Sequence, residues 1–557
     1  MRDERGLDGG DGAAGHGDGG DDDAQRDFDA EQADALLAAF RRELGDPESL
    51  GLPDPDLGLT DEFGGELVDA FGDEAGRQPE DLNEETEAKP EPLSERESAE
   101  RTVRERTDWR DEADRVMDEL MERVGEAQPE PRLGPTRRAA ELLGDVHRSA
   151  PVVHLTGTNG KTSTARITAA LLGAHGLRVG LMTSPHLERL NERIEIEGEP
   201  ISDERLAVNW GDIQPVLTIV DAELEAAGEV RLTFFEALTV LAFACFTDAP
   251  VDVVVLEVGM GGEWDSTNVA DGDVAVFTPI ALDHASRLGS TIAEIARTKA
   301  GIIKPAARVV TAIQAPEALA EIAAACALRD ATLAVEGSEF ELVSDTPEGP
   351  AARDIVVRAR SGTYEGVLPL RGAYQAHNAS LAIAAVEAFF GGEQQLRAEV
   401  VQQGLAAVTS PGRLQRIGHR PAVFIDAAHN PHGALALAEA APHAMGRRII
   451  VVLGVLDDKD YPGVIRALAP IAAGFIATRS ESPRAVDAEV LAERIAELTG
   501  HEPDAFDRLE EALEHARDLV SGDEGGAVLV TGSVTMLGDA IRLAREEGWG
   551  ATGTDLA

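Results

Sequence analysis

The chain contains only two cysteines in 557 residues, Cys245 and Cys326, and both lie within apolar segments. Since no close cysteine pair predicts a zinc site or a redox-active dithiol, we expect reduced thiols. No apolar run approaches the roughly 18–20 residues that a membrane-spanning helix needs. The N-terminal stretch MRDERGLDGGDGAAGHGDGGDDD lacks the apolar core of a secretory signal. We therefore expect a soluble, cytoplasmic protein with no membrane partner.

Basic residues are also scarce, because 50 Lys and Arg face 102 Asp and Glu and give a formal net charge of −52. Residues 1–100 alone contain 32 acidic and 8 basic residues. An acidic surface repels nucleic acid and anionic membranes, which argues against both as partners. A salt-adapted proteome would produce the same balance.

Residues 1–105 are rich in Asp, Glu and Gly and contain no strand-like run. Such a composition buries too little apolar surface to offset chain entropy, so it predicts a disordered acidic tail. Two short amphipathic segments, ADALLAAFRREL and GGELVDAFG, leave open an alternative in which they form transient helices or bind a partner.

Beyond the tail, buried-looking strands alternate with amphipathic helices, a pattern that predicts an α/β fold with a parallel-rich sheet. The strands PVVHLTG, RVGLMTS, VDVVVLEVG and VAVFTPI belong to a first domain over residues 106–408. A second, smaller series over 409–546 includes AVFIDAAHN, RRIIVVLGVL, GFIATRS and AVLVTGSV. Residues 335–370 alternate instead like an antiparallel meander. The sequence thus predicts two α/β domains after the tail.

A candidate phosphate-binding loop occurs in LTGTNGKTS, between a predicted strand and a predicted helix. The general pattern G-x-x-x-x-G-K-[ST] would put a glycine at 155, but Leu155 stands there and the glycine is Gly157. Gly157 and Gly160 still allow backbone N–H groups to approach phosphate, and Lys161 and Thr162 open the helix. A tight β-to-α turn with an exposed lysine is the alternative.

Other candidate residues follow two further strands. Glu257 ends an apolar strand and is followed by glycines, as a magnesium-binding carboxylate would be, although a capping or ion-pair role is the alternative. Asp283 and His284 follow the next strand, and Lys299 lies in the helix after it. Taken alone, such a histidine is more often structural and such a lysine is usually solvated.

Ten motifs occur in order, and together they resemble the folylpolyglutamate synthase/dihydrofolate synthase family of the Mur-ligase superfamily over about residues 110–545. The family's phosphate loop has the same short form, so Leu155 is no defect. The motifs are GTNGKTS, TSPHLERLNERI, TFFEALTVLAF, LEVGMGGEWDSTN, TPIALDH, KAGIIK, YQAHNASLA, SPGRLQRI, DAAHNPHGA and LGVLDDKD.

The resemblance implies a Mur-ligase-type ATP-binding domain at 106–408, a Rossmann-like glutamate ligase domain at 409–546, and two Mg²⁺ ions. Lys299 is expected to be carbamylated by CO₂, because a carbamate presents the oxygen ligands that Mg²⁺ prefers and an ammonium cannot. The implied ATP site comprises Thr158, Asn159, Gly160, Lys161, Thr162, Asn378, Arg413 and Asp426. Ser184 and Glu257 would bind one Mg²⁺ and His284 the second. The implied catalytic set is Lys161, Glu257, His284, Lys299 and His429, and the implied pterin-side contacts are Phe235, Glu236, Trp264 and Asp265.

The implied activity is ATP-dependent ligation of L-glutamate to dihydropteroate and to tetrahydrofolate (poly)glutamates through an acyl phosphate. We expect a monomer. One departure concerns Glu263, because the family usually has arginine there, and an acid cannot neutralise an anionic group. It puts in doubt a local substrate or phosphate contact, and not the fold.

Two other functions are weighed against this one. A Mur ligase acting on a UDP-muramoyl peptide would need a separate uridine-binding domain, which the acidic residues 1–105 do not resemble. A catalytically inactive nucleotide-binding or scaffold protein would not need Lys161, Glu257, His284 and Lys299 together.

Overall fold

The protein is described by a computed structural model over residues 95–550, except 127, 501 and 523–524. Both amphipathic segments of the predicted tail lie outside the described residues. Helix α2 (Glu95–Met121) spans the predicted boundary at 105/106. Residues Glu105–Ala557 form one compact unit, which contains all the elements that follow α2.

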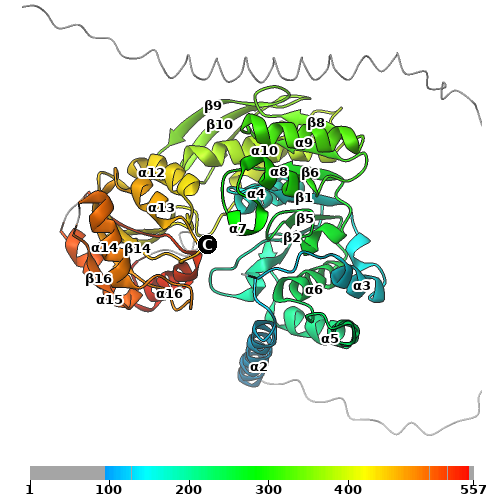
Figure 1. Ribbon diagram of the computed structural model, residues 1–557, viewed down its shortest axis with the longest axis horizontal. Coiled ribbons are helices and arrows are strands. Elements are labelled where there is room, and N and C mark those ends of the chain that lie inside the picture. Colours follow the sequence, from blue (N-terminus) through cyan, green and yellow to red (C-terminus); the bar gives the residue numbers. More distant parts are fainter. Residues whose placement is uncertain (1–94, 127, 501, 523–524, 551–557) are drawn as a thin grey trace, which may run out of the picture. The chain divides into compact units, whose positions relative to one another are not determined.

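The first domain is built on an eight-stranded sheet with the order β4-β3-β2-β5-β1-β6-β7-β8 (Figure 1). Strands β2, β5, β1, β6, β7 and β8 are parallel, whereas β3 and β4 extend the edge antiparallel. This confirms the predicted parallel-rich sheet. The bounds are β1 (Val152–Thr156), β2 (Val179–Met182), β3 (Ile194–Ile196), β4 (Glu199–Pro200), β5 (Val253–Glu257), β6 (Val274–Phe277), β7 (Arg308–Thr311) and β8 (Thr332–Val335).

Helices cover both faces of this sheet because successive strand side chains point to opposite sides. Val153 and Leu155 of β1 pack with one set of helices, and Val152 packs with another. The first set is α4 (Lys161–Ala174), α10 (Ala373–Phe389) and α11 (Ala398–Ala406). The opposite face carries α3 (Gly134–Leu142), α5 (Asp203–Ala227), α6 (Phe234–Asp248), α7 (Ala285–Leu288), α8 (Ile292–Ala300) and α9 (Pro316–Leu328). Short 3₁₀ turns are η2 (Val146–Arg148), η3 (Leu190–Arg193) and η4 (Ser266–Val269).

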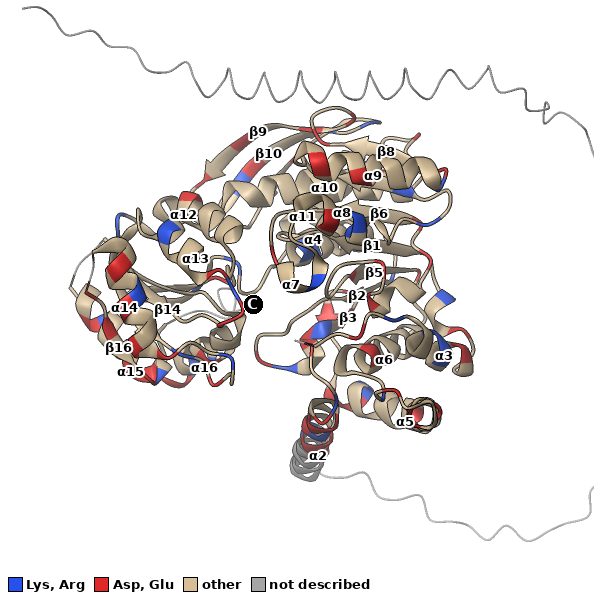
Figure 2. Ribbon diagram, viewed as in Figure 1, with Lys and Arg blue, Asp and Glu red and all other residues tan. Residues whose placement is uncertain are grey.

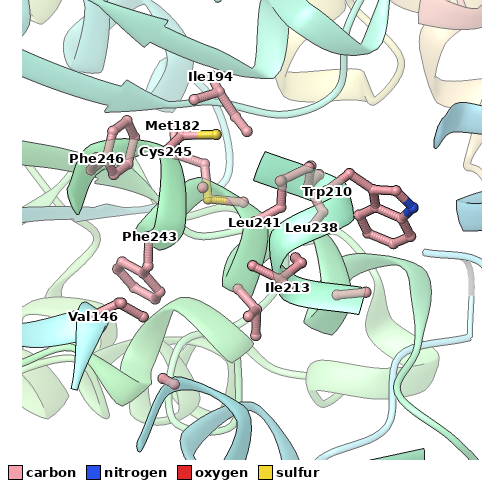
Figure 3. Close-up of a cluster of buried hydrophobic side chains, with 14 of the residues drawn as sticks. Val146, Met182, Ile194, Trp210, Ile213, Leu238, Leu241, Phe243, Cys245 and Phe246 are labelled. Carbon is pink, nitrogen blue, oxygen red and sulfur yellow. The ribbon is translucent and has the colours of Figure 1, made fainter. Parts of the chain in front are cut away.

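Helix α6 is the centre of the core on the α5 side. Phe243, Cys245 and Phe246 from α6 meet side chains from α5 and from the sheet, including Trp210 and Met182 (Figure 3). Cys245 is free and fully buried in this cluster, and Cys326 is free and buried in the separate cluster around α8 and α9. The 25-residue helix α5, which has Pro215 in its interior, was not predicted from the sequence.

The predicted meander is confirmed as a separate antiparallel sheet with the order β11-β10-β9. Its strands are β9 (Glu341–Glu348), β10 (Ala352–Arg358) and β11 (Thr363–Leu368). Ile355, Val357 and Leu368 join the apolar cluster that also contains α10 and α11, so the meander extends the core of the first domain.

The second domain contains a six-stranded sheet with the order β12-β13-β17-β14-β15-β16, in which only β12 is antiparallel. Helices α12 to α14 pack on one face, and α15 and α16 on the other. The strands are β12 (Gln415–His419), β13 (Ala422–Ile425), β14 (Arg448–Leu453), β15 (Ala472–Thr478), β16 (Asp504–Phe506) and β17 (Gly526–Thr531). The helices are α12 (Pro431–Met445), α13 (Tyr461–Leu468), α14 (Ala488–Thr499), α15 (Leu509–Val520), η5 (Val534–Met536) and α16 (Leu537–Glu546).

Charged ribbon segments of both signs are scattered over both α/β domains (Figure 2). Within the described part of the chain, no helix is both long enough and apolar enough to cross a membrane.

Candidate active site

A cavity of about 940 Å³ is lined by residues from both α/β domains. It receives the loops at the carboxyl ends of β1, β5 and β6, which is where ligands bind in open α/β sheets. The cavity is lined by every predicted site residue: Thr158, Asn159, Gly160, Lys161, Thr162, Ser184, Phe235, Glu236, Glu257, Trp264, Asp265, His284, Lys299, Asn378, Arg413, Asp426 and His429.

The phosphate loop connects β1 to α4 through two glycines in the left-handed region. Gly157 has φ 146° and Gly160 has φ 88°. A side chain at Gly157 would collide with Thr278, and a Cβ at Gly160 would lie 2.6 Å from Oδ1 of Asn378. Both positions therefore require glycine, and the two-residue shortening of the loop still delivers backbone N–H groups to the N-terminus of α4.

Lys161, the first residue of α4, is a partly buried cation beside this loop. Among the described residues, its Nζ has one hydrogen-bond partner, the carbonyl oxygen of Thr158 at 3.4 Å. Burial lowers the pKa of Lys161, and the negative charge of Glu257 opposes that shift. A partly buried ammonium that forms no ion pair with a described carboxylate is suited to bind an incoming anion such as phosphate.

Glu257 at the end of β5 provides a buried carboxylate opposite the loop. Its Oε1 accepts a hydrogen bond from Thr162 Oγ1 at 2.9 Å, and its Oε2 accepts one from Ser184 N at 3.3 Å. Burial raises the pKa of Glu257, whereas Lys161 lowers it. The described residues contain no group of three or more His, Cys, Asp or Glu that could bind a metal by themselves. One carboxylate with neighbouring hydroxyls is nevertheless how Mg²⁺ is bound when nucleotide phosphates supply its other ligands.

Lys299 lies inside the protein, on α8. Its Nζ donates a hydrogen bond to the carbonyl oxygen of Gly157 at 2.7 Å. Burial, aided by the positive charge of Lys161, lowers the pKa of Lys299 to about 7. About half of the amine is therefore unprotonated near pH 7, and its hydrogen bond to Gly157 joins α8 to the phosphate loop.

Asp283 joins the two domains at the edge of the cavity. Its Oδ1 accepts a hydrogen bond from Lys459 Nζ at 2.8 Å, and its Oδ2 accepts one from Asn430 Nδ2 at 3.0 Å. His429 Nε2 lies 3.5 Å from Oδ2. Burial alone would raise the pKa of Asp283, but the nearby His429 and Lys459 outweigh burial and hold it well below its usual range.

A second contact between the domains pairs two side-chain amides. Asn159 of the phosphate loop donates to Asn430 at 3.2 Å, and Asn430 donates back at 3.1 Å. Asn430 also caps α12 by accepting from Gly433 N at 2.8 Å. The start of α12 is thereby tied directly to the phosphate loop.

His284 adopts the left-handed conformation with φ 50°, and its Nε2 lies 3.2 Å from Lys459 Nζ. Burial lowers the pKa of His284 to about 4, so the ring is neutral at physiological pH. A neutral imidazole is the form that binds metal ions.

The remaining residues of the predicted ATP site are Asn378, in the first domain, and Arg413 and Asp426, at the connection to the second domain. Asn378 on α10 abuts Gly160, and its Nδ2 donates to Gln375 Oε1 at 2.9 Å. Asp426 instead accepts from the backbone of Leu414 and Ala428, both at 2.8 Å, so its carboxylate holds together the connection between domains. Arg413 lies in that connection and lines the cavity.

On the other side of the phosphate loop, the predicted pterin-side carboxylates already have partners. Glu236 forms a capping box with Thr233 and receives two hydrogen bonds from Arg132, each of 3.0 Å. Asp265 accepts from Met260 N at 2.9 Å and from the backbone and hydroxyl of Thr267. The aromatic residues Phe235 and Trp264 also line the cavity. This part of the cavity thus combines aromatic faces with carboxylates fixed in place.

Glu263 does not line the cavity, and its side chain is exposed. Its backbone supplies the contacts instead, with N donating to Thr298 O at 2.9 Å and O accepting from Asn268 Nδ2 at 3.0 Å. The departure from arginine therefore leaves the described cavity wall unchanged.

Several residues of the site were not among those predicted. Lys459, Asn430, Arg132 and Arg287 all contribute to the cavity or to the contact between domains. Lys459 and Asn430 do occur in the quoted motifs LGVLDDKD and DAAHNPHGA, which is a signal that could have found them. Arg132 and Arg287 had no such signal.

Comparisons with known proteins agree with this architecture. The Mur ligase middle domain matches residues 155–386, and the Mur ligase glutamate ligase domain matches residues 412–534. The dihydrofolate synthase/folylpolyglutamate synthase of Mycobacterium tuberculosis is 43% identical over 443 residues, which cover 74% of this chain and 90% of that protein.

Two solved structures are similar along nearly their whole length. Folylpolyglutamate synthase of M. tuberculosis, complexed with ADP and AMPPCP, is 41% identical with a TM-score of 0.74, covering 80% of this chain and 99% of that one. A bifunctional folylpolyglutamate synthase/dihydrofolate synthase with Mn, AMPPNP and L-glutamate bound is 31% identical with a TM-score of 0.64. The match covers 75% of this chain and 95% of that one.

Proposed function

The chain belongs to the dihydrofolate synthase/folylpolyglutamate synthase family of Mur ligases, and from this membership we propose that it is an ATP-dependent glutamate ligase with both activities. Its acceptors are dihydropteroate and tetrahydrofolate (poly)glutamates, and its amino-acid substrate is L-glutamate. Because the cavity is lined by residues of one chain, a monomer suffices for the reaction.

The reaction proceeds in two steps. A carboxylate oxygen of the acceptor attacks the γ-phosphorus of ATP, the bond to ADP breaks, and an acyl phosphate forms. The amine of L-glutamate then attacks the acyl carbon, inorganic phosphate leaves, and the nitrogen loses a proton to give the amide. Such transfers depend on alignment and charge stabilisation more than on a covalent protein nucleophile.

The phosphate loop and Lys161 bind and orient the nucleotide phosphates. Thr162, Ser184 and Glu257 are the residues that would bind one divalent cation, and His284 would bind a second. Mg²⁺ bound there supplies positive charge that offsets the charge of the phosphoryl oxygens. The buried position of Glu257, with only neutral donors in contact, supports this role.

Lys299 is proposed to be carbamylated. Its lowered pKa leaves a large share of the amine unprotonated near pH 7, and only an unprotonated amine attacks CO₂. The resulting carbamate would replace the buried amine beside the loop with an anion that can bind Mg²⁺.

The contacts of Asp283 and Asn159 with the second domain support closure around the substrates. Lys459 and Asn430 bring that domain against the loop, which would exclude water from the acyl phosphate. Scattering that detected no compaction on adding nucleotide and acceptor would contradict closure.

The observation that carries the proposal is the convergence of Lys161, Glu257 and Lys299 on one phosphate loop inside a cavity shared by both domains. The test is an assay with ATP and L-glutamate in which dihydropteroate or tetrahydrofolate is the acceptor, with products identified by mass spectrometry. We expect ligation to both acceptors and none by the Lys161→Ala variant. Activity with a UDP-muramoyl acceptor, and with no folate, would instead identify a cell-wall ligase.

A further inference from the structure

We propose that Arg287 binds the spare α-carboxylate of the terminal glutamate on a folate acceptor, and so favours glutamylated folates over dihydropteroate. This inference rests on the proposed function. It assigns a specificity-determining residue to the acceptor end of the same cavity.

The first observation is that Arg287 has no partner among the described residues. Seven lysines and arginines line the cavity, and six of them form a hydrogen bond or ion pair within the protein. Arg287 is exposed and forms neither with any residue that the structure describes. The six partnered residues are Arg132, Lys161, Lys299, Arg413, Lys459 and Arg484.

The second observation is where α7 places this guanidinium. Arg287 N donates to His284 O at 2.9 Å, so Arg287 is one helical turn from a residue at the proposed reaction centre. Leu288 belongs to the apolar cluster against which Trp264 packs, and Trp264 is one of the proposed pterin-side residues. Arg287 therefore lies between His284, at the proposed reaction centre, and Leu288, on the proposed acceptor side, and all three residues line the cavity.

The two acceptors differ in the number of carboxylates near the reacting group. Dihydropteroate has one carboxylate, and it is the reacting group. A glutamylated folate has a reacting γ-carboxylate and an α-carboxylate only a few bonds away, and each added glutamate brings another. A guanidinium binds carboxylate through two parallel N–H bonds.

Two other anions could use the same guanidinium chemistry, namely the carboxylates of incoming L-glutamate and the phosphates of ATP. Both are required with either acceptor. Loss of Arg287 would then weaken the two ligations equally, whereas loss of an α-carboxylate contact weakens only the ligation to glutamylated folate.

The test compares the full-length Arg287→Gln variant with wild type in both ligations. We expect KM for tetrahydrofolate monoglutamate to rise about fivefold to tenfold, because one exposed charge-assisted contact is lost. The ratio of kcat/KM for tetrahydrofolate monoglutamate to that for dihydropteroate should fall by the same factor. Arg287→Lys should recover part of the ratio, since it keeps the charge. Arg360→Gln, at an exposed arginine outside the cavity, is the matched control.

Each other outcome overturns the inference. An unchanged ratio of the two kcat/KM values means that Arg287 does not bind the α-carboxylate. A raised KM for L-glutamate or ATP with both acceptors assigns the guanidinium to those substrates. Absence of ligation by the wild-type protein would instead refute the proposed function. The wild-type assay comes first, so that result is known before any variant is compared.

Discussion

The ammonium of Lys459 lies 2.8 Å from Oδ1 of Asp283, although the two residues are 176 positions apart and belong to different domains. Both side chains are almost completely buried, at 10% and 9% exposure. Removing one member of such a pair leaves an uncompensated charge, which costs more than the pair itself contributes.

We therefore expect Lys459→Met to destabilise the protein by roughly 3–5 kcal/mol and to lower kcat at least tenfold. Denaturant unfolding and steady-state rates measure the two effects. The double variant Asp283→Asn/Lys459→Met should lose less than the sum of the single variants, since it leaves no unpaired charge. Additive losses would mean that the pair does not couple the domains.

The pKa of Lys299 predicts a pH dependence. Its value of about 7 means that the amine is protonated below pH 7 and neutral above it. Because only the neutral amine takes up CO₂, enzyme freed of CO₂ should regain activity at pH 8 when CO₂ is restored, but several times more slowly at pH 6 with the same concentration of dissolved CO₂. Initial rates after timed incubation measure this. Equal recovery at both pH values, or none, would contradict carbamylation.

A substitution at Gly157 should damage the phosphate loop through collision as well as strain. Gly157→Ala places a methyl group against Oγ1 of Thr278, and we expect a loss of about 2–4 kcal/mol in stability together with weaker ADP binding. Gly176→Ala is the matched control, because Gly176 also has positive φ but has nothing within 4 Å of the added carbon. Calorimetry of unfolding and of ADP binding gives both values, and equal losses would exclude the collision.

Glu263→Arg introduces the arginine that the family resemblance led us to expect at this position. Because the Glu263 side chain is exposed and outside the cavity, we expect kcat/KM for either acceptor to change less than twofold. A larger gain would show that the loop from Gly259 to Asp265 moves to bring this position into the site.

The sequence was sufficient for those parts of the fold and site that depend on local pattern. Continuous apolar runs predicted β1 and β5, and the GTNGKTS motif predicted the loop whose glycines have positive φ. Helix α5 was missed because it has Pro215 in its interior and little amphipathic contrast.

Contacts between segments that are distant in the sequence could not be predicted in the same way. Asp283 was noticed only as a residue after a strand, and nothing local indicates that Lys459 and Asn430 meet its carboxylate. Similarly, Glu236 was predicted on the pterin side, but its partner Arg132 lies 104 positions away and only folding brings them together. Pairings of this kind depend on the tertiary fold, and the local spacing of residues in one sequence does not reveal them.

The two buried cysteines allow local opening of the first domain to be measured through their chemical labelling. Burial raises the pKa of both thiols, to about 12 for Cys326, so in the folded protein almost no reactive thiolate exists. Cys245 lies in the α5–α6 layer and Cys326 in the α8–α9 layer. The rate at which an alkylating reagent labels each one therefore measures how often that layer separates from the sheet, without any engineered probe.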